Sequence, residues 1–573
     1  MTGTAAPGVF AAAGLIAVLT LVARVVGFGR WLVFSQSVGT TCVGSVYQAA
    51  NQLPNVIFEV AAGGALAAVV VPIIAGQLAR PNSGATQNSA EAAQTASAML
   101  TWTLAVLVPL SILMAASARP LASFMVDDQR CSGSTDLMAS MIVVFSPQIA
   151  LYGVGIVLAG VLQAHRRFLG VVLAPLLSSL VVMAAYLMFG ALAQGKGNDL
   201  ARLPSRASMA LALGTTLGVA VLSLSLLIPV HRAGVRLRPT WTFPDGVARR
   251  ASALAGAGLL ALFAQQVAVL VTLWVSQHRG GTGTLNVYVY AQAIYLLPYA
   301  VLAVPFAMSA LPALATGLDQ AVLATGLDQA VLATGLDQAV LATAPVQASF
   351  ARAQSTLASS ARAIIVATSA GAAVLFAIAS PTGAFFSALD AGRHNPHGIA
   401  ALAALPGALS AFAPGLVGFG MAALLTRALY VQGRPAVAGG LVALGWFIAA
   451  IVPLLVLQSD AGPRSTLIAL GLASSLGMTV AALGLFVAVR RTWGVKAFRG
   501  FGRSAVVACG AGLFSAAVGR GLAAVLHPQG LVAGAVVAAL VAVVVAMLFA
   551  GSIWIGDRGS ARLALAKLPG RAR

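Results

Sequence analysis

Long apolar runs dominate this sequence and restrict what the chain can fold into. A helix needs about 20 apolar residues to cross the ~30 Å hydrocarbon core of a bilayer, and such runs recur along the whole chain. Only 8% of the residues are charged, whereas soluble domains carry roughly 25%. Backbone polar groups in lipid must bond within their own segment, and the runs are too long for barrel strands. The sequence therefore predicts an all-α, polytopic membrane protein.

The runs can be assigned to about fourteen transmembrane helices, arranged as two six-helix lobes plus two C-terminal helices. Their ranges are 9–33, 46–78, 95–117, 137–162, 168–193, 208–231, 251–276, 286–311, 361–380, 399–425, 435–458, 465–489, 504–525 and 529–553. The domains expected from them are an N-lobe (1–231), a basic linker (232–250), a C-lobe (251–489), the last two helices (490–553) and a basic tail (554–573). Residues 1–23 contain no Lys or Arg, so the first span is expected to stay in the membrane rather than be cleaved as a signal peptide.

Charge is distributed unevenly between the loops. Sorting the loops by side gives about 22 positive residues on one side and about 9 on the other, which by the positive-inside rule places both termini in the cytoplasm. The net charge of +20 is therefore interpreted as topogenic. A nucleic-acid partner is not expected, because the basic residues form no stripe or recognised motif. The expected location is the inner (plasma) membrane.

Two repeats stand out. Residues 48–54, Gln-Ala-Ala-Asn-Gln-Leu-Pro, echo residues 292–298, Gln-Ala-Ile-Tyr-Leu-Leu-Pro, which predicts two parallel lobes with the substrate path between them. Residues 315–341 repeat Ala-Thr-Gly-Leu-Asp-Gln-Ala-Val-Leu three times. Nine residues make about two and a half helical turns, so the repeats cannot form one apolar stripe. This segment is interpreted as a cytoplasmic loop expansion without chemistry, and docking of another molecule is the alternative.

Ionisable groups at membrane depth are costly and mark transport pathways by default. Arg24 and Arg30 lie on the first span in Arg-Val-Val-Gly-Phe-Gly-Arg. Six residues rotate an undistorted helix by about 240°, so both can face one cavity only if Gly27 and Gly29 permit a bend. The functional interpretation is that the guanidiniums grip a diphosphate. The alternative is that they snorkel to an interface.

Polar residues on two other spans complete the candidate binding site. Glu59 lies in the second span, with Asn55 one turn before it and Pro54 opening the backbone. The carboxylate is expected to pair with Arg24 or to titrate during transport, unless it faces solvent. Gln292 in the eighth span would line the same cavity, although interhelical hydrogen bonding is the plainer alternative.

Other chemistry finds little support. Cys42 and Cys131 fall in loops expected outside the cytoplasm, where a disulfide could persist, and free thiols are the alternative. The sequence shows no CxxC or metal-ligand spacing and no Ser/His/Asp grouping, so neither an enzyme nor a cofactor or metal site is expected.

Residues 19–74 resemble a known family. The carrying motifs are Ala23-Arg24-Val25-Val26-Gly27-Phe28-Gly29-Arg30, Leu53-Pro54-Asn55, Gly63-Gly64-Ala65 and Val71-Pro72, with weaker matches at Arg167-Phe168, Tyr290-Ala291, Ala310-Leu311-Pro312 and Arg427-Ala428-Leu429-Tyr430. They are similar to the MurJ/MviN lipid II flippases of the multidrug/oligosaccharidyl-lipid/polysaccharide exporter superfamily, most closely to the actinobacterial branch.

This resemblance implies a V-shaped, two-lobed transporter that moves an undecaprenyl-diphosphate-linked sugar-peptide lipid by alternating access. It also implies that Arg24 and Arg30 contact the diphosphate. The chain departs from the family at Ser45, often acidic in other members, and at Phe58 and Ala293, where arginines are expected. The cationic cavity is thus depleted.

The leading hypothesis is therefore a lipid II flippase, with this lipid and the surrounding membrane lipids as partners. One rival is a drug/cation antiporter of the same superfamily, for which Glu59 is the single intramembrane acidic candidate. The other is a membrane scaffold that does not transport and whose cytoplasmic loops recruit cell-wall synthesis proteins.

Overall fold

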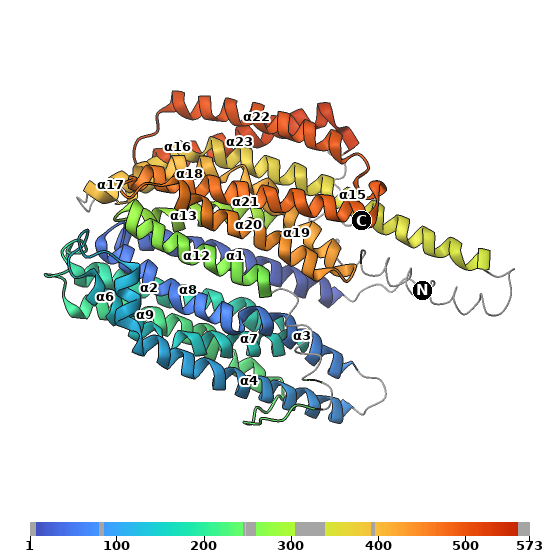
Figure 1. Cartoon of the computed structure of the whole chain (residues 1–573), viewed down its shortest axis with the longest axis horizontal. Coiled ribbons are helices and arrows are strands. Elements are labelled where there is room, and N and C mark those ends of the chain that lie inside the picture. Colours follow the sequence, from blue (N-terminus) through green and yellow to red (C-terminus); the bar gives the residue numbers. More distant parts are fainter. Residues whose placement is uncertain are drawn as a thin grey trace. The chain divides into compact units, whose positions relative to one another are not determined.

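The structure is a computed structural model that describes residues 7–79, 85–244, 247, 259–303, 314, 339–390 and 396–559. Within these ranges every regular element is helical, and no strand occurs. Figure 1 shows long helices joined by short turns. The prediction of an all-α membrane protein is confirmed.

The chain divides into two compact units. Unit 1 comprises Met1–Val287 with Leu389–Leu402, and unit 2 comprises Tyr288–Ala388 with Ala403–Arg573. The chain passes between the units at three points, the first of which falls inside the helix α13 (Thr284–Pro298). The predicted lobe boundary at 232–250 concerns how the membrane spans are grouped, not which residues form a compact unit. It stays a prediction.

Unit 1 contains the helices that follow the N-terminus. They are α1 (Pro7–Ser37), α2 (Cys42–Phe58), η1 (Glu59–Gly63), α3 (Gly64–Leu78), α4 (Ala85–Ala116), α5 (Ala118–Met125), α6 (Ser134–Phe145), α7 (Gln148–Ala164), α8 (Phe168–Ala193), α9 (Ser205–Leu224), α10 (Leu227–Arg232), α12 (Leu259–Val275), η3 (Ser276–Gly280) and most of α17 (Pro396–Ala403). Small residues let α8 and α9 pack closely: a Cβ on Gly214 or Gly218 would collide with Ala185 or Val182. Close approach through small residues is the usual packing of helices in membranes.

Unit 2 contains the remaining helices. They are the rest of α13, η4 (Tyr299–Ala303), α15 (Ala339–Ala377), α16 (Ala379–Asp390), α18 (Leu405–Phe412), α19 (Gly415–Val431), α20 (Pro435–Val456), α21 (Gly462–Trp493), η6 (Val495–Phe498), α22 (Phe501–Leu526) and α23 (Leu531–Gly556). Gly445 on α20 and Gly477 on α21 face each other, and a Cβ on either would meet the backbone carbonyl of the other. Trp493 is buried in the core of this unit, and its indole N–H donates to the Ala428 carbonyl at 3.2 Å.

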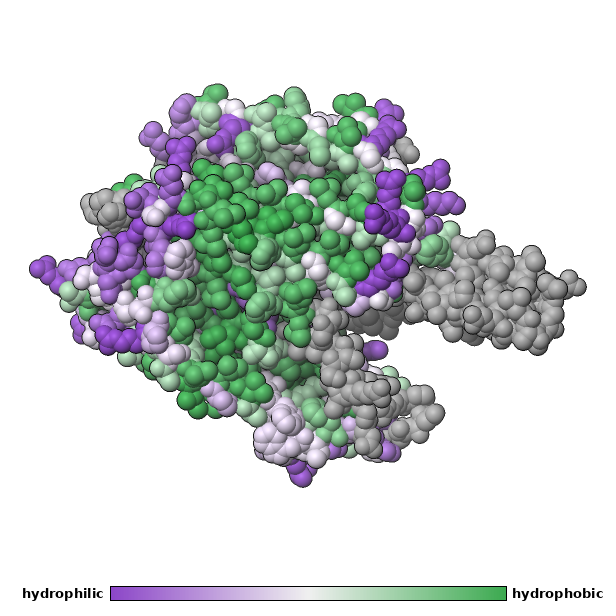
Figure 2. All heavy atoms as spheres, in the orientation of Figure 1, coloured by the Kyte–Doolittle hydropathy of each residue, from purple (hydrophilic) through white to green (hydrophobic). Residues whose placement is uncertain are grey.

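Ten helices of the described chain are long and apolar enough to cross a membrane, or eleven if the bent pair Gly398–Phe412 and Gly415–Val431, 47° apart, is one span. Figure 2 shows hydrophobic side chains gathered over the middle of the helices and hydrophilic ones at their ends. The ten coincide with ten of the predicted spans, and the bent pair with the span at 399–425. Of the remaining three, the span at 46–78 is interrupted by the π-helical turn η1, and the span at 9–33 lies on α1. The span at 286–311 is described as far as residue 303, where it forms α13 and η4.

Several predicted segments lie partly outside the described residues. Residues 315–338 of the nonapeptide repeat lie outside the described residues, and residues 339–341 begin α15. The basic linker is described as far as residue 244, and at residue 247, and the C-terminal tail as far as residue 559.

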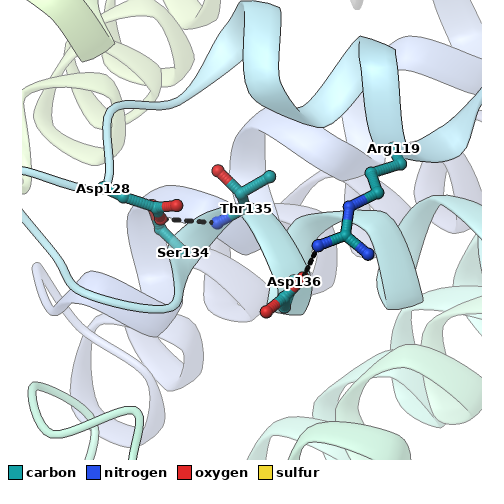
Figure 3. Close-up of polar contacts among 5 residues, drawn as sticks. All are labelled: Arg119, Asp128, Ser134, Thr135 and Asp136. Atoms are coloured by element: carbon teal, nitrogen blue, oxygen red, sulfur yellow. Dashed lines mark hydrogen bonds and ion pairs between the residues drawn. The ribbon is translucent and has the colours of Figure 1, made fainter.

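A disulfide joins Cys42, at the start of α2, to Cys131 in the loop before α6, with a Cα–Cα distance of 6.1 Å. This settles the alternative that the sequence left open. Beside it, the Asp128 carboxylate accepts hydrogen bonds from the Ser134 hydroxyl (2.8 Å) and the Thr135 N–H (2.9 Å) at the start of α6 (Figure 3). The loop is thus held both covalently and by capping of a helix N-terminus.

Candidate functional site

Arg30 is a partly buried cation on the first predicted span. It lies on α1, which packs against α8, and its guanidinium is 5.1 Å from the centroid of the Trp31 ring. Its Nε is buried and has no hydrogen-bond partner among the described residues. A buried guanidinium donor without an acceptor is costly, so this N–H is a candidate donor to a ligand.

Three tyrosines of unit 1 lie within electrostatic range of this arginine, and they are named here the tyrosine cluster: Tyr47, Tyr152 and Tyr186. The Arg30 guanidinium acts electrostatically on all three hydroxyls. The Tyr47 and Tyr186 hydroxyls bond to each other at 3.0 Å, and Tyr47 also bonds to the Thr215 hydroxyl at 3.0 Å. The cluster holds hydroxyl oxygens near the positive charge inside an otherwise apolar bundle.

Aromatic packing fixes the position of the cluster. The Phe34 ring, one turn after Arg30 on α1, stacks on Tyr47 at 5.7 Å and meets Tyr186 edge-on at 5.1 Å. Phe145 of α6 meets Tyr47 at 5.9 Å. These edge-to-face and offset contacts are the favoured geometries of aromatic pairs. Side chains of the helices α1, α2, α6 and α8 therefore fix the positions of the Tyr47 and Tyr186 rings.

Arg24 is placed differently. Its side chain is exposed, and the described residues include no ion pair between Arg24 and Glu59. The helix α1 continues without interruption from Pro7 to Ser37. A Cβ added to Gly27 or Gly29 would meet no atom within 4 Å, so these glycines border open space. The structure does not bring the two arginines to one place.

Asn55 and Glu59 lie on one face of α2 and η1. With Gln48 and Gln52 they follow the i, i+4, i+7, i+11 spacing of a helical stripe. Gln48 is 1% exposed, and its Nε2 has no described partner. The Glu59 carboxylate folds over Gly63, where an added Cβ would be 2.5 Å from Oε2. The stripe runs along α2 into η1, from the buried Gln48 to the half-buried Asn55 and Glu59.

Gln292 belongs to unit 2 and is half-buried on α13. On the same face, Tyr295 packs against Phe412 at 5.4 Å and Tyr299 against Phe419 at 4.4 Å. Arg427 of α19 acts electrostatically on the Tyr299 hydroxyl. Unit 2 thus has its own arrangement of an arginine beside tyrosines, with Gln292 on the helix that carries it.

The residue pattern alone gave Arg30, Asn55, Glu59 and Gln292 but missed the tyrosine cluster. Tyr47, Tyr152 and Tyr186 are the tyrosines of residues 1–287, among eight in the chain, and that scarcity was the available signal. The described residues contain no group of three or more His, Cys, Asp or Glu side chains that could hold a metal ion. The arrangement can donate hydrogen bonds and offset negative charge.

The number and apolar length of the helices define a multi-pass, all-helical membrane protein. The fold is similar to a structure titled "Lipid II flippase MurJ, inward closed conformation", with a TM-score of 0.68 and 16% identity, covering 94% of this chain and 99% of that one. It is also similar to an inward-facing multidrug resistance MATE family transporter of the MOP superfamily (TM-score 0.57, 14% identity, 83% and 98% covered). A third match is a mutant of the Vibrio cholerae MATE transporter VcmN (TM-score 0.53, 11% identity, 84% and 97% covered).

The family model "Lipid II flippase MurJ" matches residues 34–541. This is nearly the whole chain, and the chain belongs to the lipid II flippase MurJ family. The resemblance seen in the sequence motifs is confirmed.

Proposed function

We propose that this chain carries lipid II, the undecaprenyl-diphosphate-linked peptidoglycan precursor, across the inner membrane by alternating access, with both termini in the cytoplasm. Membership of the flippase family supports the cargo. The observation that carries the assignment to a site is the Arg30 guanidinium, which is partly buried beside the tyrosine cluster with an unpartnered Nε–H.

The chemistry of this site suits a diphosphate. A guanidinium donates two parallel hydrogen bonds to phosphate oxygens, and low surrounding polarity strengthens that attraction relative to water. The half-buried Tyr152 hydroxyl can donate a further hydrogen bond to the same oxygens, whereas the protons of Tyr47 and Tyr186 are already used in the bonds to Thr215 and to each other. The lipid tail would remain in the bilayer while the charged head group enters the protein.

The polar stripe of α2 and η1 would receive the sugar and peptide. Asn55 offers an amide, and Glu59 offers a carboxylate that accepts hydrogen bonds from hydroxyl or N–H groups. Gln292, a half-buried amide on α13, is a further candidate contact for the head group. Arg24, which is exposed, would meet the diphosphate on entry rather than at the bound position.

Alternating access requires contacts that break and re-form at one end of the protein. In unit 1 the Asn286 side chain donates to the Gly39 carbonyl at 2.7 Å, and the Gly283 N–H donates to the Ser45 hydroxyl at 2.8 Å. The Gln277 amide also donates to the Ser45 carbonyl at 3.0 Å. Residues 277–286 belong to the predicted C-lobe and residues 39–45 to the predicted N-lobe. These bonds would form the gate that is closed in this state.

The test is transport of a fluorescent lipid II analogue in vesicles that contain the purified full chain. Loss of a charge-assisted hydrogen bond costs about 1.5–3 kcal/mol, so Arg30→Gln should slow transport roughly 10–100-fold. Arg30→Lys keeps the charge but not the paired donors, so its transport rate should lie between those of the wild type and Arg30→Gln. Arg464→Gln, an exposed arginine at the start of α21, is the matched control and should transport normally.

Four outcomes would contradict the proposal or favour one of its rivals. Full transport by Arg30→Gln at normal abundance would refute the role of this arginine. Wild-type vesicles that never move the analogue would refute the cargo itself. Energy-dependent export of cationic drugs would then favour the antiporter. In cells depleted of the protein, lipid II that still reaches an impermeant external probe would favour the scaffold.

A further inference from the structure

The segment 235–244, named here the strap, connects α10 toward α12 and follows the side of α4 without forming a helix or strand. It is drawn as irregular green ribbon beside α4 in Figure 1. The Arg238 N–H donates to the Ser97 hydroxyl at 3.1 Å, and the Thr240 N–H donates to the Thr101 hydroxyl at 3.2 Å. Two hydroxyls one helical turn apart on α4 therefore accept the backbone hydrogen bonds that a neighbouring strand would accept in a β-sheet.

The strap turns back at Trp241. The Trp102 indole N–H donates to the Trp241 carbonyl at 3.1 Å, and the two rings form an edge-to-face pair with centroids 5.2 Å apart. The apolar side chains Val235, Leu237 and Phe243 pack into the core of unit 1. The strap is thus fixed by backbone hydrogen bonds and by its apolar side chains.

The sequence of α4 shows where this turn lies relative to a membrane. Residues 85–98 contain no Leu, Ile, Val, Met, Phe or Trp, whereas residues 99–116 contain no charged residue. Trp102 stands where the polar part of the helix gives way to the apolar part. Trp102 is 47% exposed and Trp241 59% exposed. Exposed tryptophans at such a boundary are typical of the membrane–water interface.

Three arginines lie in the strap or just before it, on the polar side of this boundary. Arg232, Arg236 and Arg238 are all exposed, and the backbone of Arg238 is bonded to Ser97, about one turn before Trp102. Arg167 also reaches this surface, where its guanidinium donates to the Arg232 carbonyl at 3.1 Å. The tryptophan pair thus places these arginines at the depth of lipid head groups.

We infer that the strap and its arginines form a binding surface for acidic phospholipid head groups. A guanidinium pairs with a phosphate through two hydrogen bonds, and basic residues at the surface of an anionic leaflet each add to the attraction. A soluble acidic protein would explain the arginines but not the exposed tryptophan pair at the apolar boundary. This inference is independent of the transported substrate.

The test uses the full chain in phosphatidylcholine vesicles that contain 30 mol% phosphatidylglycerol. A photoactivatable phosphatidylglycerol or phosphatidylcholine probe is cross-linked, and the labelled peptides are mapped. Each arginine contributes about fivefold to association with an anionic surface. The phosphatidylglycerol preference of strap peptides should therefore fall by on the order of a hundredfold in the variant Arg232→Gln/Arg236→Gln/Arg238→Gln, and raised salt should weaken it in the wild type.

Controls make the outcome decisive. Arg202→Gln/Arg206→Gln/Arg464→Gln removes three exposed arginines outside the strap, one in the loop before α9 and two in the first turns of α9 and α21, and should keep the preference of the strap peptides. The single variant Arg236→Gln alters a side chain that makes no hydrogen bond or ion pair among the described residues. It should give about a fivefold loss even if the triple variant folds poorly. An unchanged preference in the strap variants, or an equal loss in the control, would overturn the inference. Competition by millimolar inorganic phosphate would assign the site to a soluble anion and would also overturn it.

Discussion

The hydroxyl pair at the centre of the tyrosine cluster permits a stability test with a defined order of effects. Tyr47→Phe removes the bonds to Tyr186 and Thr215 but keeps the ring that packs against Phe34 and Phe145. Thr215 still donates to the Leu211 carbonyl at 2.8 Å. The Tyr186 hydroxyl, in contrast, loses its described partner while it stays 2% exposed. One buried hydroxyl is therefore orphaned.

The magnitudes follow from which group is left unpaired. Tyr47→Phe should cost about 1–3 kcal/mol, because a buried donor loses its partner. Tyr186→Phe should cost only about 0.5–1.5 kcal/mol, since Tyr47 keeps its bond to Thr215. The double variant orphans neither tyrosine hydroxyl, so it should cost less than the sum of the two single changes. Hydrogen bonds between membrane helices average about 0.6 kcal/mol in such cycles, which sets the lower limit of the coupling.

The free energy of unfolding of all four proteins should be measured in mixed detergent micelles, where helical membrane proteins can unfold reversibly. Circular dichroism and tryptophan fluorescence should give the same transition before a free energy is extracted. If Tyr186→Phe is as costly as Tyr47→Phe, or if the two changes are additive, the bonded pair is not a coupled unit and the reasoning fails.

Three further outcomes are expected. Replacing Cys42 and Cys131 by Ser should lower the free energy of unfolding by roughly 2–4 kcal/mol, and reduction of the wild type should give the same loss. Gly477→Ala should destabilise by about 1–3 kcal/mol because its Cβ meets backbone of α20, whereas Gly440→Ala, on an open face of α20, should be nearly neutral in the same assay. Burial alone would raise the pKa of Asp128, but hydrogen bonds from the start of α6 outweigh it and lower the pKa. The folded pKa is thus below the unfolded one, so this contribution is complete above the ordinary Asp pKa of about 3.9 and is lost as pH falls through the folded value. Asp128→Asn should flatten the acid limb of a stability–pH curve.

The extent of each apolar run predicted helices well where the run was uninterrupted. The span expected at 168–193 is the helix Phe168–Ala193, and the span expected at 435–458 is Pro435–Val456. The span expected at 361–380 belongs to a helix that begins at Ala339. Hydropathy reports which residues can lie in lipid, whereas alanine-rich sequence continues a helix beyond the membrane. Helix length and span length therefore differ at this position.

The sequence identified the two arginines of α1 by their charge but could not predict which of them is buried. Six residues rotate a helix by about 240°, so a straight α1 cannot bury both arginines on one side. The structure partly buries Arg30 and leaves Arg24 exposed. The sequence could not decide between them, because the choice depends on α8 packing against α1. The tyrosine cluster was missed for a similar reason: a tyrosine in an apolar helix is equally compatible with a core, an interface or a site.

The short echo between residues 48–54 and 292–298 has a structural counterpart. Each segment ends in a proline, and each is followed by a π-helical turn, Glu59–Gly63 in unit 1 and Tyr299–Ala303 in unit 2. A proline removes one backbone N–H from the helical ladder, and wide turns of this kind occur mostly at functional positions. In both units the polar candidates, Asn55 and Glu59 in one and Gln292 in the other, lie at or within two turns of this feature. The repeated motif therefore encodes a local widening of the backbone beside polar side chains in each unit, and the proposed substrate contacts of each unit have this structural feature in common as well as the similarity of sequence.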